Sequence, residues 1–325
     1  MGEKKLSAVL VHVDGAKNAG ARVAFAGALA DDFGARLIGA ASGQMAIPVY
    51  APFGEGFVSL QPEVVEAARK QVSDQVAAAA ASFRAAAGAR TNVEWRASEA
   101  NEPAGYLVEQ ARAADVVVVG RPAKGDPEDV MLGIAASDIV LSVGRPVMVV
   151  PPGVERLSGK RVVVAWKDTR EARRAVIDAL PFLKAAEEVI VVGAGDETPL
   201  AAVEDVAAYL KGHGVAAKAL VEALTDSHPA HALVRVAQRV NADLIVTGAF
   251  ASLRELFTTI EGCIDAGISV ATPHTLAAAG NFLGFQVADL DVIRCEAPAE
   301  EEGPLQLGGV KPGLMLAGPS QGAAP

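Results

Sequence analysis

The stretch Ala-Asp-Val-Val-Val-Val-Gly, residues 114 to 120, occurs a second time as Ala-Asp-Leu-Ile-Val-Thr-Gly at residues 242 to 248. Each copy follows a helical pattern and ends an apolar run at a glycine, which is typical of a buried strand. The segments Val11–Val23 and Val164–Val176 also match, since each passes from a β-rich run through a polar turn into a helix. The chain is therefore predicted to carry one α/β unit twice, with function at equivalent loops or at the boundary between the copies.

Composition narrows the class of protein. A chain of 325 residues with 51% hydrophobic residues is long enough for two cores. Its most apolar runs have the length of strands, so we expect no membrane span, and the polar N-terminus shows no secretory signal. A net charge of −10 argues against a nucleic-acid partner. Two cysteines, Cys263 and Cys295, without zinc or redox spacing fit a reducing compartment, so we expect a cytoplasmic protein.

Strands and helices alternate along most of the chain, which predicts doubly wound, mostly parallel sheets with helices on both faces. We expect a first unit over 1–152, a second, partly degenerate unit over 160–275, and a disordered tail over 276–325. The expected strands cover 6–13, 36–41, 93–97, 115–120, 147–150, 161–166, 188–192, 216–223, 243–247 and a poor last strand at 269–270. The expected helices cover 16–33, 62–87, 103–113, 129–143, 170–183, 199–212 and 227–240.

Ligands of doubly wound sheets bind outside the carboxyl ends of the strands. In the first unit this edge carries the turn with Asp14, the loop after the second strand and the turn that begins at Gly120. Asp14 beside Gly15 also suits an ordinary turn and helix N-cap. His12 and the two tryptophans, Trp95 and Trp166, are interpreted as packing residues.

These residues carry a resemblance. An aspartate that ends the first strand, the fourth strand at 114–120 and the closing run Gly144-Arg-Pro-Val-Met-Val-Val-Pro151 together resemble a tandem member of the universal stress protein family. The resemblance covers roughly 5–150 and 161–257. It implies two units of the adenine-nucleotide alpha-hydrolase-like fold related by a pseudo-two-fold axis. It also implies that the final strands of the units pair within the chain, with homodimerisation as a further expectation.

Many members of that family bind ATP through a glycine pattern after the fourth strand, and the resemblance implies the same role here. Gly120 and Gly133 hold the outer positions, whereas Ala123 replaces the middle glycine and Ile134 replaces the following Ser or Thr. Glycines let backbone amides approach phosphates, and a hydroxyl adds one hydrogen bond, so part of the pattern is missing. The candidate nucleotide-binding residues are Asp14, Gly120, Lys124 and Gly133, with Lys124 as a counter-charge for phosphate.

The second unit departs further from the pattern. Gly248 keeps the first position, Ala251 takes the second, and Glu261 stands where the third glycine belongs. Lys167 aligns with the aspartate of the first unit. After Phe257 the family pattern dissolves, which leaves two readings: this half kept only a packing role, or the encoded C-terminus is shifted in frame.

Other motifs point to no chemistry. Gly193 and Gly195 begin a dinucleotide fingerprint, but no third glycine follows, and His228 with His231 is interpreted as a solvated helix start rather than a metal site. We therefore expect no catalytic residues, no metal and no certain cofactor. The expected function is a non-enzymatic cytoplasmic stress-response protein that binds a small molecule or a protein partner. The alternative is an ATP-binding switch with at most slow hydrolysis; a nucleotide-dependent transferase lacks any motif.

Overall fold

The structure is a computed structural model of the whole chain. It describes residues 6–43, 62–121, 133–134, 136–140, 142–195, 198–224, 229–248 and 269–272. Contacts group Met1–Gly280 as one unit and Asn281–Pro325 as another, and the expected tail at 276–325 lies outside the described residues. The predicted domain boundaries near residues 152 and 160 stay predictions.

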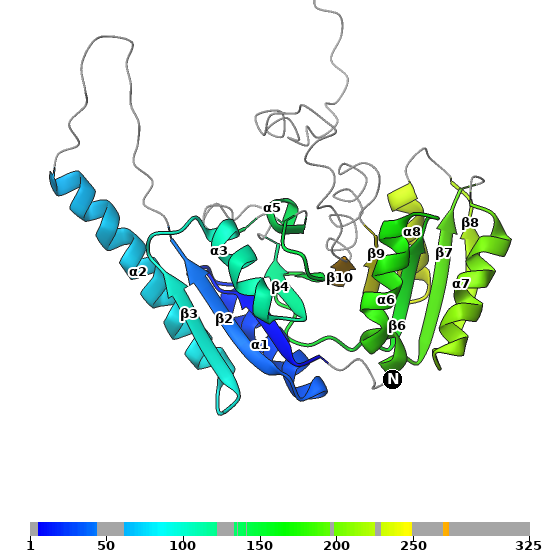
Figure 1. The fold of residues 1–325 in the computed structure, drawn as a ribbon, viewed down its shortest axis with the longest axis horizontal. Helices are drawn as coiled ribbons and strands as arrows, with labels where there is room; N and C mark the ends of the chain where they lie inside the picture. Colours follow the sequence, from blue (N-terminus) through cyan, green and yellow to red (C-terminus); the bar gives the residue numbers. More distant parts are fainter. Residues whose placement is uncertain are drawn as a thin grey trace, which may run out of the picture. The chain divides into compact units, whose positions relative to one another are not determined.

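The first half alternates strands and helices as predicted (Figure 1). Its described elements are β1 (Ala8–His12), α1 (Ala19–Phe33), β2 (Arg36–Ser42), α2 (Pro62–Ala87), β3 (Val93–Ser98), α3 (Pro103–Gln110), the short helix η1 (Ala111–Ala113), β4 (Val116–Gly120), α5 (Ala136–Val140) and β5 (Val147–Val150). The helix predicted over 129–143 is wrong at 133–134, where the backbone is not helical.

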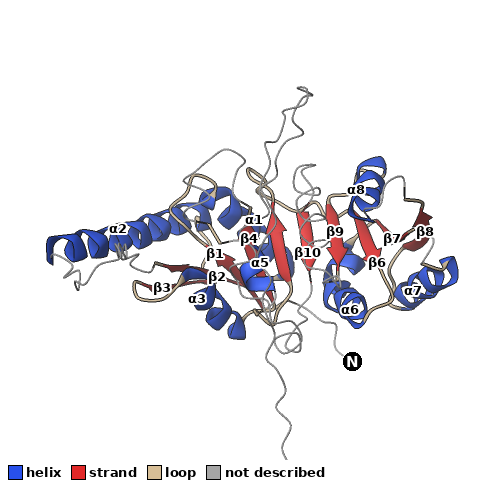
Figure 2. Ribbon diagram, turned by 90° about the horizontal axis from the view of Figure 1, so that it is seen from above, coloured by secondary structure: helices blue, strands red, loops and turns tan. Residues whose placement is uncertain are grey.

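The second half repeats the order. Its described elements are β6 (Arg161–Trp166), α6 (Arg170–Ala185), β7 (Glu188–Ala194), α7 (Leu200–Gly212), β8 (Ala217–Glu222), α8 (Pro229–Arg239), β9 (Leu244–Thr247) and β10 (Ser269–Thr272). The arginines that open α6 are exposed, and Arg173, for example, forms an ion pair with the exposed Asp168. Figure 2 shows α8 on one side of β6 and β7, with α6 and α7 on the other.

The described strands are ordered β3-β2-β1-β4-β5-β10-β9-β6-β7-β8. Every neighbouring pair is parallel except β5 with β10. Both halves therefore have the doubly wound α/β architecture that the repeat predicts. The last strand is more regular than expected, because Val270 pairs with Ile245 of β9 and also with Val149 of β5. The final strands of the two halves thus pair within the chain, as expected.

Alternating side chains place the core on both faces of the strands. Val9 and Val11 of β1 belong to the cluster that packs α1 and α2, whereas Leu10 belongs to the cluster that packs α3 and α5. The same rule holds for β6, because successive strand residues point to opposite faces. Parallel strands covered on both faces leave their carboxyl ends as the open edge, and that edge positions the candidate site.

Candidate functional site

Asp14 lies in the turn between β1 and α1, at the carboxyl edge of the strands, where the sequence predicts it. Its Oδ1 accepts a hydrogen bond from the amide of Ala16 at 3.2 Å, which closes an Asx-type turn. The helix N-cap reading of Asp14 is wrong, because α1 begins at Ala19 and its N-cap residue is Asn18. The turn therefore fixes the Asp14 carboxylate through Oδ1, and Oδ2 interacts with a side chain of α1.

That side chain is Arg22, one turn into α1. Its Nη2 donates to Oδ2 of Asp14 at 2.7 Å, and its Nε donates to the carbonyl oxygen of His12 at 2.8 Å. The side chains of Arg22 and Asp14 are only 8% and 6% exposed. A buried guanidinium that lacks partners is costly, whereas this one is matched by a carboxylate and a carbonyl. The carboxyl edge of β1 is thus occupied by an internal ion pair.

Gly120 ends β4 beside β1, and Arg22 explains why it is glycine. A Cβ added at residue 120 would meet Nη1 of Arg22 closer than real Cβ atoms approach other atoms. The absence of a side chain there lets the guanidinium lie against the strand end. Arg22 thus lies at the glycine that the resemblance expects a phosphate to approach.

His12, the last residue of β1, is buried as the sequence predicts, with 3% of its surface exposed. Burial and, to a smaller extent, the positive charge of Arg22 lower the pKa of His12 to about 4, while the negative charge of Asp14 opposes the shift. Its Nδ1 lies 3.8 Å from Oδ2 of Asp14, beyond hydrogen-bond distance. The imidazole is therefore neutral at neutral pH and is sealed from solvent.

The rest of the predicted glycine pattern is only partly described. Gly133 is half-buried, and Ile134, which stands where a hydroxyl residue is expected for phosphate binding, is 5% exposed and packs in the core. Lys124 lies outside the described residues. The structure brings Asp14 and Gly120 together around Arg22, but the role of these residues and of Gly133 in nucleotide binding stays a prediction.

The corresponding edge of the second half is built differently. Lys167, which aligns with Asp14, is exposed, and the same alignment puts Ala175 in the place of Arg22. Gly248 directly follows β9, and a Cβ there would lie 2.7 Å from the backbone nitrogen of Ala172. The start of α6 thus packs its own backbone onto the strand end, so this edge holds no buried ion pair among the described residues.

In the part of the chain that the structure describes, His, Cys, Asp and Glu residues form no group of three or more that could hold a metal ion. His231 is exposed on α8, and His228 lies outside the described residues. None of the described helices is long and apolar enough to cross a membrane.

Sequence reasoning missed Arg22, because an arginine in an alanine-rich helix reads as solvated. A signal was available in the helical spacing. Arg22 lies three residues after Ala19 and four before Ala26, both fully buried, so it shares their face of the helix. A charged residue within the apolar stripe indicates a partner inside the fold, and Asp14 is the nearest acidic residue on the preceding turn.

Comparison with known proteins supports the fold. A scan against protein-family models finds no match, and a search of the curated proteins finds none either. Among solved structures, a universal stress protein from Archaeoglobus fulgidus aligns with a TM-score of 0.57 at 17% identity, over 81% of this chain and 94% of that one. The universal stress protein UspA from Lactobacillus plantarum aligns at 19% identity over 45% of this chain and 99% of its own, with a TM-score of 0.35.

A universal stress protein in complex with cAMP aligns at 23% identity over 45% of this chain and 98% of its own, with a TM-score of 0.27. Scores this low do not support a comparison of ligand sites, so the assignment rests on the Archaeoglobus structure, which spans both halves. Its alignment agrees with the strand order and the repeated helices. The chain has the α/β fold of the universal stress proteins, present twice in one polypeptide.

Proposed function

We propose that this chain is a tandem universal stress protein that acts in the stress response by binding a small molecule or a protein partner, without catalysis. The observation that carries the proposal is the Asp14–Arg22 ion pair, which fills the carboxyl edge of β1 and β4 on a universal stress protein fold. Carboxylate and guanidinium satisfy each other there, so neither is free to act on a substrate. The same proposal assigns the protein to the cytoplasm and leaves homodimerisation as a prediction.

The geometry around His12 supports a non-catalytic site. A general base needs a pKa near the working pH and must reach the proton that it removes. His12 has its pKa lowered to about 4 and is buried beneath the ion pair. Its position thus fits a packing residue rather than an acid–base catalyst.

A nucleotide switch in the first half is the alternative, and one observation favours it. Asp14 and Gly120, two of the four residues of the predicted nucleotide site, lie at one edge on either side of Arg22. A guanidinium is a good partner for phosphate, so displacement of Asp14 from Arg22 would supply the cation that the degenerate glycine pattern lacks. Such binding would have to break a buried ion pair first.

Phosphate release tests the non-catalytic part of the proposal. We expect purified protein incubated with ATP and Mg²⁺ for several hours to release no more inorganic phosphate than a buffer blank. An Arg22→Met variant serves as the matched control, because any hydrolysis that stems from a contaminating enzyme persists in it. Phosphate release by the native chain that disappears in this variant would replace the proposal with the nucleotide switch.

A further inference from the structure

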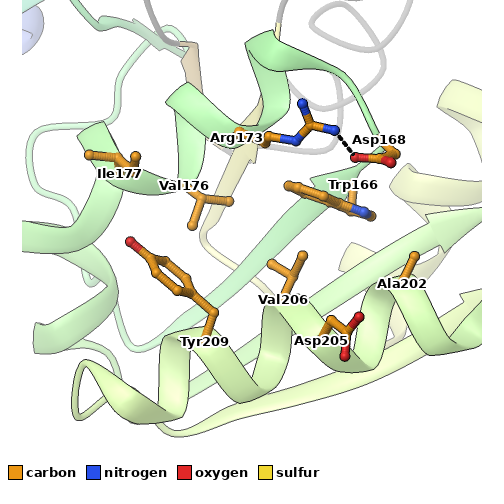
Figure 3. A pocket seen from close by; sticks show the side chains of 9 residues that line it. All are labelled: Trp166, Asp168, Arg173, Val176, Ile177, Ala202, Asp205, Val206 and Tyr209. Carbon is orange, nitrogen blue, oxygen red and sulfur yellow. Dashed lines mark hydrogen bonds and ion pairs between the residues drawn. The ribbon is translucent and has the colours of Figure 1, made fainter.

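A cavity lies away from the Asp14–Arg22 pair, between α6 and α7 of the second half. It has a volume of about 410 Å³, within the usual range of small-molecule sites, which is about 300–1,000 Å³. Figure 3 shows Val176 and Ile177 of α6 opposite Tyr209 of α7, with the indole of Trp166 lying between Arg173 and Val206. The described residues that line it are Trp166, Asp168, Arg173, Val176, Ile177, Ala202, Asp205, Val206 and Tyr209.

The equivalent residues and helices of the first half can be compared with those that form this cavity. Trp166 aligns with Val13, which is 1% exposed and packs in the core, and Ile177 aligns with Ala24. Helix α1 packs directly against α2, whereas α6 and α7 make few direct backbone contacts. The repeated fold is therefore built with a small residue and closely packed helices in one copy. The tryptophan and the space beside it are features that the second copy adds.

The indole supplies a polar group without a partner. Trp166 is 7% exposed, and its Nε1 is fully buried with no hydrogen-bond acceptor among the residues that the structure describes. Figure 3 shows this nitrogen on the side of the cavity where Asp168 and Ala202 lie. A buried tryptophan usually finds an acceptor for its N–H, because an unsatisfied donor is costly. An acceptor atom on a bound molecule would satisfy it once the side chains around the nitrogen move to admit that atom, because the nitrogen does not contact solvent in this structure.

The walls and the rim define the chemistry of that molecule. The rings of Trp166 and Tyr209 offer aromatic surface, and Ile177 and Tyr209, which are 37% and 45% exposed, leave apolar surface open at the cavity. Arg173, the single arginine among the described lining residues, is already bonded to Asp168. Asp205 adds a second carboxylate, so the rim does not favour an anion.

We propose that the cavity between α6 and α7 binds a planar, uncharged heteroaromatic molecule that accepts a hydrogen bond from the indole N–H of Trp166. The aromatic and aliphatic walls hold the ring system, and the acceptor fixes its orientation. This site goes beyond the proposed function, since it involves no residue of the first half, and its test is read at Trp166 rather than at Asp14.

Nuclear magnetic resonance of ¹⁵N-labelled full-length protein with quinoline tests the proposal. Quinoline is planar, is neutral at neutral pH and carries one ring-nitrogen acceptor. The chain has two tryptophans, Trp95 and Trp166, so a Trp166→Phe variant assigns the two indole N–H signals. We expect quinoline to shift the Trp166 indole proton downfield in a saturable way, as hydrogen bonding does, and to leave the Trp95 signal in place. Naphthalene, which has no acceptor, should cause no downfield shift.

Variants of the walls separate a built site from unspecific contact. Tyr209→Ala and Ile177→Ala should each weaken the affinity for quinoline by about 2- to 10-fold, because each removes part of a wall. Leu200→Ala, at the exposed start of α7 and outside the cavity lining, should leave the affinity unchanged. Since the wall side chains are partly exposed, these variants are expected to fold, and their thermal unfolding checks this.

Several results would overturn the proposal. One is an indole shift that does not saturate, that affects Trp95 equally, or that survives both wall substitutions unchanged. Another is a Trp166 signal that moves with protein concentration before any quinoline is added, because the cavity would then be an interface between copies of this chain. Binding of MgATP at the first half would leave this result untouched, so the two proposals fail separately.

Discussion

Nη2 of Arg22 lies 2.7 Å from Oδ2 of Asp14, and the two side chains are more than nine-tenths buried at the carboxyl edge of β1. The arginine also donates to the carbonyl of His12 and lies against Gly120, so one guanidinium joins β1, α1 and the end of β4. In a universal stress protein fold this edge is where the resemblance predicts a nucleotide. The pair therefore has both a structural and a functional consequence, and each can be measured.

Removal of one partner should destabilise the chain strongly. We expect Asp14→Asn or Arg22→Met to lower the free energy of unfolding by about 3–5 kcal/mol, because each leaves a buried group without its counter-charge. The double variant Asp14→Asn/Arg22→Met should lose less than the sum of the single losses, since both charges are gone. Urea unfolding followed by circular dichroism measures all three. Additive losses would show that the two side chains do not depend on each other.

Stability should also decrease as the pH drops, because His12 takes up a proton more readily in the unfolded chain than in the folded one. Its folded-state pKa is about 4, whereas the unfolded chain titrates near 6.5, so between these values the unfolded state binds more protons. This contribution is absent above about pH 6.5 and destabilises the fold progressively as the pH falls, by about 3 kcal/mol near pH 4. We expect His12→Gln to remove this part of the pH dependence in urea unfolding. An unchanged slope in the variant would mean that another group causes it.

Two glycines at equivalent strand ends should respond differently to alanine. Gly120→Ala places a methyl group against the guanidinium of Arg22, and Gly248→Ala places one against the backbone of Ala172. Each is expected to lower the unfolding free energy by about 1–3 kcal/mol through overpacking. The Arg22→Met background should relieve most of the cost at residue 120 and none at residue 248. Equal costs of Gly120→Ala in both backgrounds would exclude Arg22 as its cause.

The N-cap of α6 gives a local prediction in the second half. Oγ1 of Thr169 accepts a hydrogen bond from the amide of Ala172 at 3.2 Å. Thr169→Ala should therefore lower the unfolding free energy by about 1 kcal/mol. Thr169→Ser should keep most of the stability that the cap supplies, because a serine hydroxyl also accepts the capping hydrogen bond. Thermal unfolding of the three proteins compares them. A serine variant as unstable as the alanine variant would place the effect in the methyl group instead of the hydroxyl.

The sequence allowed most of the fold to be predicted because local pattern and tertiary role agree there. The run at 116–119 is apolar throughout, follows a helix and leads into a glycine, and it forms β4 between β1 and β5. The last strand was underestimated, since Ser269–Thr272 is short and gains one of its two partners from β5, more than a hundred residues away. Pairing over such a separation leaves no local signal.

The candidate site was predictable only in part. Asp14 and Gly120 were found because the carboxyl ends of parallel strands meet at one edge. Their meeting with Arg22 depends on the rotation of α1 against β1, which the alanine-rich helix does not reveal. The cavity beside Trp166 exists because α6 and α7 lie apart, and the sequence does not reveal this separation. A tryptophan within a strand predicts only a packed side chain.

Calorimetric titration of the purified full-length chain with ATP and Mg²⁺ tests the central claim most directly. With Arg22 seated on Gly120 and bonded to Asp14, we expect no binding heat up to millimolar ATP. Asp14→Asn and, as the matched control in the exposed turn of the second half, Asp168→Asn are titrated beside it. Micromolar binding by the native chain that Asp14→Asn changes and Asp168→Asn preserves would contradict the account and establish the first half as a nucleotide site.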